Sequence, residues 1–122
     1  MNLATAILIG LLYGLGAYLM MQRALTRIVI GLAMLAHGAN LLLLAAGGRA
    51  GQAPIVEEGT AGAAYADPLP QALALTAIVI TFGVTAFLLA LAYRSWVLGG
   101  SDEVEDDVED RRIAQLGHRQ KQ

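Results

Sequence analysis

The chain contains no cysteine, and this absence excludes disulfide bridges, thiolate metal sites and cysteine nucleophiles. Charge is scarce as well, because Asp, Glu, Lys and Arg together make up only 15% of its 122 residues. The formal net charge is −2 and no basic patch is present, which argues against nucleic-acid binding. Paired carboxylates, phosphate-binding loops and metal-ligand spacings are also lacking, so we expect no catalytic site, no cofactor and no bound metal.

The few charges are segregated along the chain, and hydrophobic residues make up 57% of it. Three runs contain no charge at all: 1–22, 28–48 and 69–93. A membrane-spanning helix needs about 20 apolar residues, and none of the runs has the polar face that a helix of a soluble protein would show. The sequence therefore predicts an all-α membrane protein whose three transmembrane helices cover about 3–21, 28–46 and 71–93.

The charges that flank these runs predict an orientation. Arg23 and Arg27 follow the first run, and Arg94 follows the third. By the positive-inside rule, the connector between the first two helices and the C-terminal tail are cytoplasmic, and the N-terminus is outside. We therefore expect a three-helix transmembrane domain at 1–95 and a charged cytoplasmic tail at 96–122 that is partly helical or disordered.

Small residues indicate where the helices pack. Gly10 and Gly14 have GxxxG spacing, which permits a close approach of two backbones in a membrane. Ala33 and Ala36 lie on one stripe of the second helix, together with two polar residues. Polar groups that face lipid find no hydrogen-bond partner, so we expect this stripe to face protein or water.

The uncharged polar residues of the spans are candidates for an ion pathway or a helix interface: His37, Asn40, Thr76, Thr81 and Thr85. An imidazole can relay protons near neutral pH, but a neutral His37 hydrogen-bonded to a neighbouring helix is the simpler alternative. Threonine hydroxyls can bond to the preceding turn of their own helix, so the hydroxyls alone indicate little. Three thin helices cannot enclose a substrate path, so we expect one component of a larger membrane assembly.

The segment before the third helix begins Asp-Pro-Leu-Pro-Gln, a combination that disfavours regular structure. It predicts a rigid turn that leads into the helix and consists mainly of four residues: Asp67, Pro68, Pro70 and Gln71. The residues after the turn form a long uncharged helix that carries hydroxyl groups. A helix of this kind, which satisfies every backbone polar group internally, is expected in a membrane.

The whole segment, DPLPQALALTAIVITFG, closely resembles the third-helix signature of the C subunits of Mrp-type multisubunit monovalent cation (sodium)/proton antiporters. The second-helix residues from Ile30 to Leu41 fit the same family, and the resemblance covers about residues 3–95. It implies a bacterial cell (inner) membrane complex that exchanges external protons for internal sodium or another monovalent cation, without a redox cofactor. The chain would be a multi-pass subunit of a secondary transporter and not an enzyme, with the lipid bilayer and other membrane subunits as its partners.

That family is similar to the K subunits of the proton-pumping NADH-quinone oxidoreductases, which have one membrane glutamate in the second helix and another in the third. Laid onto this sequence, the glutamates fall near Ala33 and Thr81, so both carboxylates are absent. Gly31 and Asn40 of the wider pattern remain, whereas His37 stands where many relatives have Asn. The resemblance thus implies a chain that packs and positions its neighbours and can line a hydrated cavity, while larger partners hold the charged transport residues.

Two other functions stay open at this point. A holin-like protein that forms membrane lesions is also small, with two or three spans and a charged tail. Such a lesion does not require the Asp-Pro-Leu-Pro-Gln segment or the threonine series, which favour the antiporter subunit. A K-type subunit of a redox-driven proton pump is disfavoured by the missing glutamates.

Overall fold

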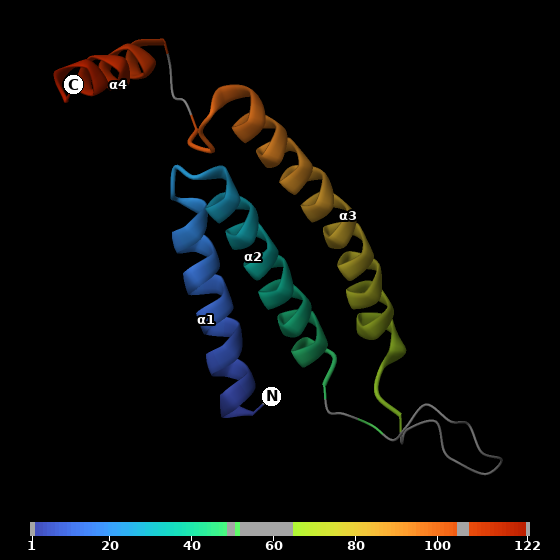
Figure 1. Ribbon diagram of the computed structural model, residues 1–122. Coiled ribbons are helices and arrows are strands. Elements are labelled where there is room, and N and C mark those ends of the chain that lie inside the picture. Colours follow the sequence, from blue (N-terminus) through green and yellow to red (C-terminus); the bar gives the residue numbers. More distant parts are fainter. Residues whose placement is uncertain (1, 49–50, 52–64, 105–107, 122) are drawn as a thin grey trace.

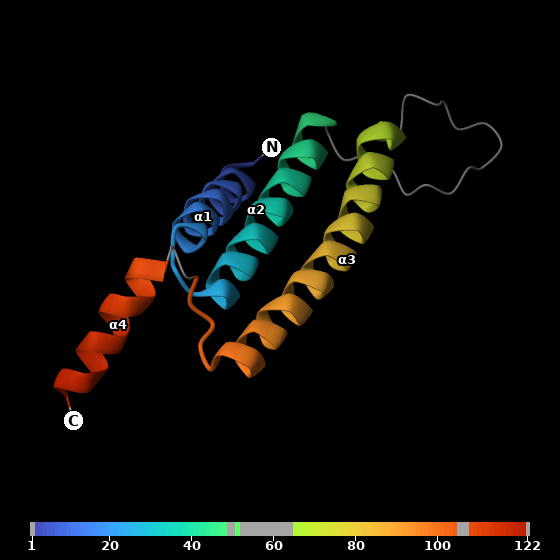
Figure 2. The ribbon, with the colours of Figure 1, turned by 90° about the horizontal axis from the view of Figure 1, so that it is seen from above.

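Three long helices lie side by side in a computed structural model that describes residues 2–48, 51, 65–104 and 108–121 (Figure 1). The helices are α1 (Leu3–Met20), α2 (Leu25–Ala46), α3 (Pro68–Gly99) and α4 (Val108–Gln120). Helix α2 lies in the middle and contacts both α1 and α3, whereas α4 lies apart, beyond the end of the layer where α3 finishes (Figures 1 and 2). The described part of the chain is therefore a single layer of three helices with one additional helix.

Helices α1, α2 and α3 are each long and apolar enough to cross a membrane, with lengths of 18, 22 and 32 residues. This confirms the prediction of an all-α membrane protein with three spans. Many large apolar side chains of the layer are exposed, among them Leu3, Phe82 and Leu98, each by more than three quarters of its surface. In a membrane such surfaces meet lipid or other subunits, so their exposure is consistent with the three spans.

Helix α3 begins at Pro68, three residues before the predicted start at Gln71. Asp67 is the N-cap, and its Oδ1 accepts a hydrogen bond of 3.0 Å from the backbone N–H of Leu69. Both prolines fall within the first turn, where a backbone N–H has no partner inside the helix. The prolines therefore start the helix rather than hold a separate turn before it, which corrects the predicted boundary.

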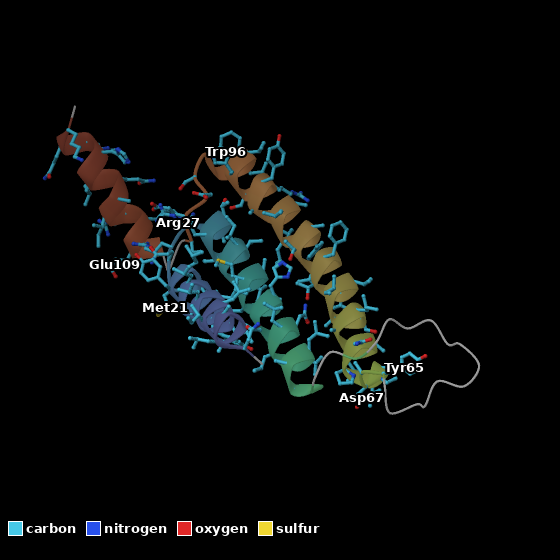
Figure 3. The ribbon with its side chains drawn as sticks, turned by 90° about the horizontal axis from the view of Figure 1, so that it is seen from below. Met21, Arg27, Tyr65, Asp67, Trp96 and Glu109 are labelled. Atoms are coloured by element: carbon cyan, nitrogen blue, oxygen red, sulfur yellow. The ribbon has the colours of Figure 1, made fainter. Side chains whose placement is uncertain are left out.

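The other boundaries differ at the opposite end of the layer. Helix α3 continues past the predicted Tyr93 to Gly99 and stops at Gly100, whose φ of 72° is left-handed and whose N–H donates to the carbonyl of Trp96. Helix α2 starts at Leu25 rather than at 28. In Figure 3, Arg27 and Trp96 lie at this end of the layer, and Tyr65 and Asp67 lie at the other.

Part of the predicted tail, which begins at residue 96, thus extends α3, and part of it forms α4. The described side chains of α4 are exposed, including Ile113 and Leu116. The described part of the tail contains a helix over Val108–Gln120. The division into a transmembrane domain and a cytoplasmic tail stays a prediction.

Glycines build the contact between α1 and α2. A Cβ atom on Gly31 would lie 2.7 Å from the carbonyl oxygen of Gly16, and a Cβ on Gly16 would lie 3.0 Å from that of Gly31. Such distances are shorter than a side chain tolerates, so the two backbones touch because neither residue has a side chain. One end of the layer is therefore closed by a direct contact between backbones.

The predicted Gly10–Gly14 pair lies elsewhere on α1. A Cβ on either residue would meet nothing within 4 Å among the described residues, and both are exposed. The close approach of α1 to α2 occurs at Gly16 instead. A packing role for Gly10 and Gly14 stays a prediction, and it concerns contacts outside this chain.

Candidate functional site

The surface shared by α2 and α3 carries most of the predicted polar residues, and we call it the α2–α3 seam. The least exposed residues of α3 recur every three or four positions along one face: Pro70, Ala74, Ala77, Thr81, Thr85, Leu88 and Ala92. On α2 the face opposite Gly31 and Gly38 carries a matching series: Val29, Ala33, Ala36, Asn40 and Gly47. These side chains are mainly small, which lets two helices approach closely in a membrane.

The register of the seam follows from its two ends. A Cβ on Gly47 would lie 3.0 Å from Cγ of Pro70, so these two residues touch. At the other end, Thr26 and Ala92 line the same depression. Both helices rise by about 1.5 Å per residue. A residue that lies a given number of positions before Gly47 is therefore level, along the helix axes, with the residue that lies the same number of positions after Pro70. Asn40 is therefore level with Ala77.

By the same count, Ala36 is level with Thr81, and Ala33 lies within one residue of Thr85. The stripe of small residues predicted on the second helix thus opposes the half-buried face of α3 across the seam. Alanine is common on both sides of the seam, and small side chains let two helices approach closely. The sequence positions near which K-type subunits have glutamates, Ala33 and Thr81, both belong to this seam.

Asn40 is the buried polar residue of the seam, with 8% of its surface exposed. Its Nδ2 is buried and has no hydrogen-bond partner among the described residues. A buried amide without an acceptor costs a few kcal/mol in an apolar setting. The seam therefore contains one place where a water molecule or an acceptor of another subunit would lower the free energy.

His37 does not lie on the seam with the rest of its predicted stripe. It is exposed, because one step of about 100° along the helix turns it away from Ala36 and toward the open face of α2. An imidazole that faces hydrocarbon would leave its ring nitrogens unsatisfied. The open face of α2 that carries His37 is thus expected to meet protein or water and not lipid tails.

The three predicted threonines divide into two groups. The hydroxyl of Thr76 donates to the carbonyl of Ala72 at 3.0 Å, so it is satisfied within its own helix, and the residue is exposed. Thr81 and Thr85 are half-buried on the seam. Only these two threonines are therefore placed to share a polar contact with α2.

Sequence reasoning missed several residues that the structure brings together. Gly16 was not singled out, although its backbone lies against Gly31 of α2. Thr26 and Asp102 were not paired either, and they hydrogen-bond at the far end of the layer. Two features of the sequence could have pointed to these contacts. Gly16 is a glycine inside an apolar span with no second glycine four residues away, and Asp102 is an acidic residue shortly after the Gly-Gly pair that ends α3. Within the part of the chain that the structure describes, no group of three metal-ligating side chains occurs.

A layer of three apolar helices, with a seam of small residues and exposed apolar flanks, is the architecture of a small integral membrane subunit. Comparison with known proteins identifies its family. Residues 4–109 match the family described as NADH-ubiquinone/plastoquinone oxidoreductase chain 4L. The chain is 49% identical over 107 residues to the Na(+)/H(+) antiporter C subunit of Alkalihalophilus pseudofirmus, covering 86% of this chain and 93% of that protein. It is 44% identical over 106 residues to the Na(+)/H(+) antiporter C subunit of Bacillus subtilis, covering 86% and 92%.

Two solved structures are also similar to this chain. One is the Mrp complex from Dietzia sp., with a TM-score of 0.73, 39% identity, and coverage of 91% of this chain and 84% of that chain. The other is the membrane-bound sulfane sulfur reductase, an archaeal respiratory membrane complex, with a TM-score of 0.69, 37% identity, and coverage of 85% and 93%. The chain belongs to the family of Na(+)/H(+) antiporter C subunits, within the larger chain 4L family.

Proposed function

We propose that this chain is the C subunit of a multisubunit Na(+)/H(+) antiporter in a bacterial cell membrane, where it packs against and positions the other subunits. The observation that carries the proposal is the similarity to antiporter C subunits, 49% identity over nearly the full length of the relative. The subunits of such a complex together, and not a cofactor, would form the ion path. The chain itself then needs no catalytic residue.

The composition of the α2–α3 seam supports a packing role. The resemblance places the glutamates of K-type subunits near Ala33 and Thr81 of the seam, whose side chains are uncharged. Intramembrane carboxylates are the usual groups of proton pathways. A chain that has small uncharged residues at these positions fits a transporter whose proton-carrying groups belong to its larger partners.

The remaining polar groups support a second, smaller role at a hydrated surface. Asn40 presents a buried amide without an acceptor, and His37 is exposed on the same helix, one turn away. Thr81 and Thr85 add two hydroxyls to the seam from the α3 side. Together these groups would accommodate water or a polar side chain of a partner, whereas Thr76 is already satisfied by Ala72.

Deletion and co-purification test the proposed function. When the chain is produced with the other subunits from its own organism and extracted in mild detergent, we expect larger membrane subunits to co-purify with it. Everted vesicles without the chain should lose sodium-dependent proton movement, measured with a pH-sensitive dye, and regain it when the chain is supplied. Purification of the chain alone, together with unchanged antiport in vesicles that lack it, would overturn the proposal.

Overproduction of the chain alone provides the second arm of the test. Because the chain would act only within a complex, we expect the membrane potential of the producing cells to stay intact. Abrupt loss of the potential, without any other subunit present, would instead support a holin-like, lesion-forming protein.

A further inference from the structure

The segment after α3 folds back onto the connector between α1 and α2. Three hydrogen bonds join the two segments: Leu25 N–H to the Asp102 carbonyl at 2.7 Å, Val104 N–H to the Arg23 carbonyl at 2.8 Å, and the Thr26 hydroxyl to Asp102 Oδ2 at 3.0 Å. The two backbone bonds flank an antiparallel bridge between Ala24 and Glu103. We call Ser101–Val104 the clip.

The clip supplies the N-terminal cap that α2 lacks. The N-cap residue of α2 is Ala24, and it makes no side-chain capping bond. Asp102 takes over this function from outside the helix, because its carbonyl accepts the first N–H and its carboxylate accepts the Thr26 hydroxyl. A carboxylate at this end also interacts favourably with the helix dipole.

Charge complementarity supports the same arrangement. Arg23 and Arg27 of the connector line one depression together with Asp102 and Glu103 of the clip. The side chain of Ser101 steadies the segment by accepting a hydrogen bond from the Glu103 N–H at 3.2 Å. Acidic clip residues therefore lie beside the basic connector, the segment on which the predicted membrane orientation rests.

The clip attaches the C-terminal end of α3, where few other interactions fix the helix to the rest of the layer. Along the seam α3 meets α2 mainly through small side chains, and helix association in lipid lacks a hydrophobic driving force. At the other end of the pair, Pro70 of α3 touches Gly47, the C-cap of α2. A polar attachment at the clip end fixes the second end of the pair.

We propose that Ser101–Val104 is a built-in clip that caps α2 and holds the end of α3 on the α1–α2 connector before any other subunit binds. The clip needs only residues of this chain and does not depend on the antiporter function. It makes the three-helix layer a preformed unit for assembly. An experiment that disproves the clip would therefore leave the proposed antiporter function unaffected. An experiment that disproves the antiporter function would likewise leave the clip unaffected.

Disulfide cross-linking tests the clip in the full-length chain in membranes. The natural chain has no cysteine, so an introduced pair reports without background. Ala24 and Glu103 are an antiparallel pair that exchanges no hydrogen bonds, and the Cα atoms of such pairs are about 4.5 Å apart, which suits a disulfide. We expect the Ala24→Cys/Glu103→Cys chain to cross-link rapidly under mild oxidation.

The matched control moves the second cysteine by one residue, to Val104, whose side chain points to the opposite face of the extended segment. If the segment were simply mobile, the Ala24→Cys/Val104→Cys chain would cross-link about as fast as the first pair, because the two cysteines are almost equally far along the chain from α3. The clip predicts a much slower reaction for this control. Equal rates for the two pairs would overturn the proposal.

Substitutions in the cross-linking background test the bonds themselves. Asp102→Ala removes the carboxylate acceptor and should slow cross-linking by up to about fivefold, which corresponds to about 1 kcal/mol for a net hydrogen bond. Asp102→Asn keeps a side-chain oxygen and should stay close to the original rate. Thr26→Val should resemble Asp102→Ala, whereas Thr26→Ser should not. Rates that are the same for all four variants would show that Thr26 and Asp102 do not hold the clip.

Discussion

At the scale of single residues, the contact between Gly16 and Gly31 is the tightest that the glycines of the described residues make. A Cβ on Gly31 would meet the Gly16 carbonyl oxygen at 2.7 Å, the Leu19 Cβ at 2.9 Å and the Met20 backbone nitrogen at 2.9 Å. Two of these atoms belong to the α1 backbone, which cannot rotate away as a side chain can. One added methyl group must therefore push the two helices apart.

Gly31→Ala is expected to destabilise the chain by about 1–3 kcal/mol, the usual cost of overpacking. The measurement is unfolding by SDS titration from mild detergent, followed by helix-contact fluorescence or circular dichroism. Gly10→Ala is the control, because a Cβ at Gly10 meets nothing within 4 Å. An unfolding midpoint for Gly31→Ala equal to that of the control would show that the glycine contact carries no stability.

His37→Asn separates packing from proton relay at the open face of α2. Asparagine keeps hydrogen-bonding groups but cannot titrate near neutral pH. If His37 only provides a polar contact, assembly should persist and sodium-dependent proton movement should keep its pH profile. A large shift of that profile, measured in vesicles that contain the assembled complex, would identify His37 as a proton carrier.

At the scale of the elements, α3 depends on its first turn. Asp67 caps the helix, Pro68 occupies the first helical position, and Pro70 touches Gly47, the C-cap of α2. The cap, the preset backbone angles and the contact with α2 thus all act at one end of the longest helix. The segment that resembles the antiporter family is therefore the structural start of α3.

Pro68→Ala with Pro70→Ala is expected to loosen this start and lower the yield of assembled complex in a pull-down. Asp67→Ala should weaken the same turn by about 0.5–2 kcal/mol, as for other N-cap residues, whereas Asp67→Asn keeps the capping oxygen. The yield of co-purified subunits is the measurement for all variants. An undiminished yield for both the proline pair and Asp67→Ala would show that the turn is dispensable.

The spans could be predicted from the sequence because a membrane accepts only long uncharged helices, and the three runs around Ile9, Asn40 and Thr81 leave no alternative. The helix boundaries were harder to predict from the sequence, because proline can either break a helix or occupy its first position. Pro68 occupies the first position of α3. The contact of Gly16 with Gly31 depends on the geometry with which α1 and α2 cross. The spacing of residues within α1 alone does not determine that geometry. The clip was missed because backbone groups make two of its three bonds.

At the scale of the whole molecule, Arg27 and Trp96 lie at the same end of the layer as the clip (Figure 3). Tyr65 and Asp67 lie at the opposite end (Figure 3). The positive-inside rule places the Arg27 end in the cytoplasm and the N-terminus outside. This orientation remains a prediction.

Single cysteines introduced into the cysteine-free chain test the orientation. Asn2→Cys should react with a membrane-impermeant thiol reagent in intact cells, because Asn2 is expected outside and is exposed. Lys121→Cys should react only after the cells are made permeable. Labelling of Lys121→Cys in intact cells, with protection of Asn2→Cys, would reverse the predicted topology.

The clip also has a consequence for how the chain is made. Thr26 and its partner Asp102 are 76 residues apart, and ribosomes add about 5–20 residues per second. The first turn of α2 therefore waits about 4–15 s for its cap while the rest of the chain is synthesised. A chain that stops short of Asp102 contains all three spans but leaves α2 unfinished. A segment that is synthesised after the third span thus completes one of the first helices, and only a chain translated beyond that span can present the finished layer to its partners.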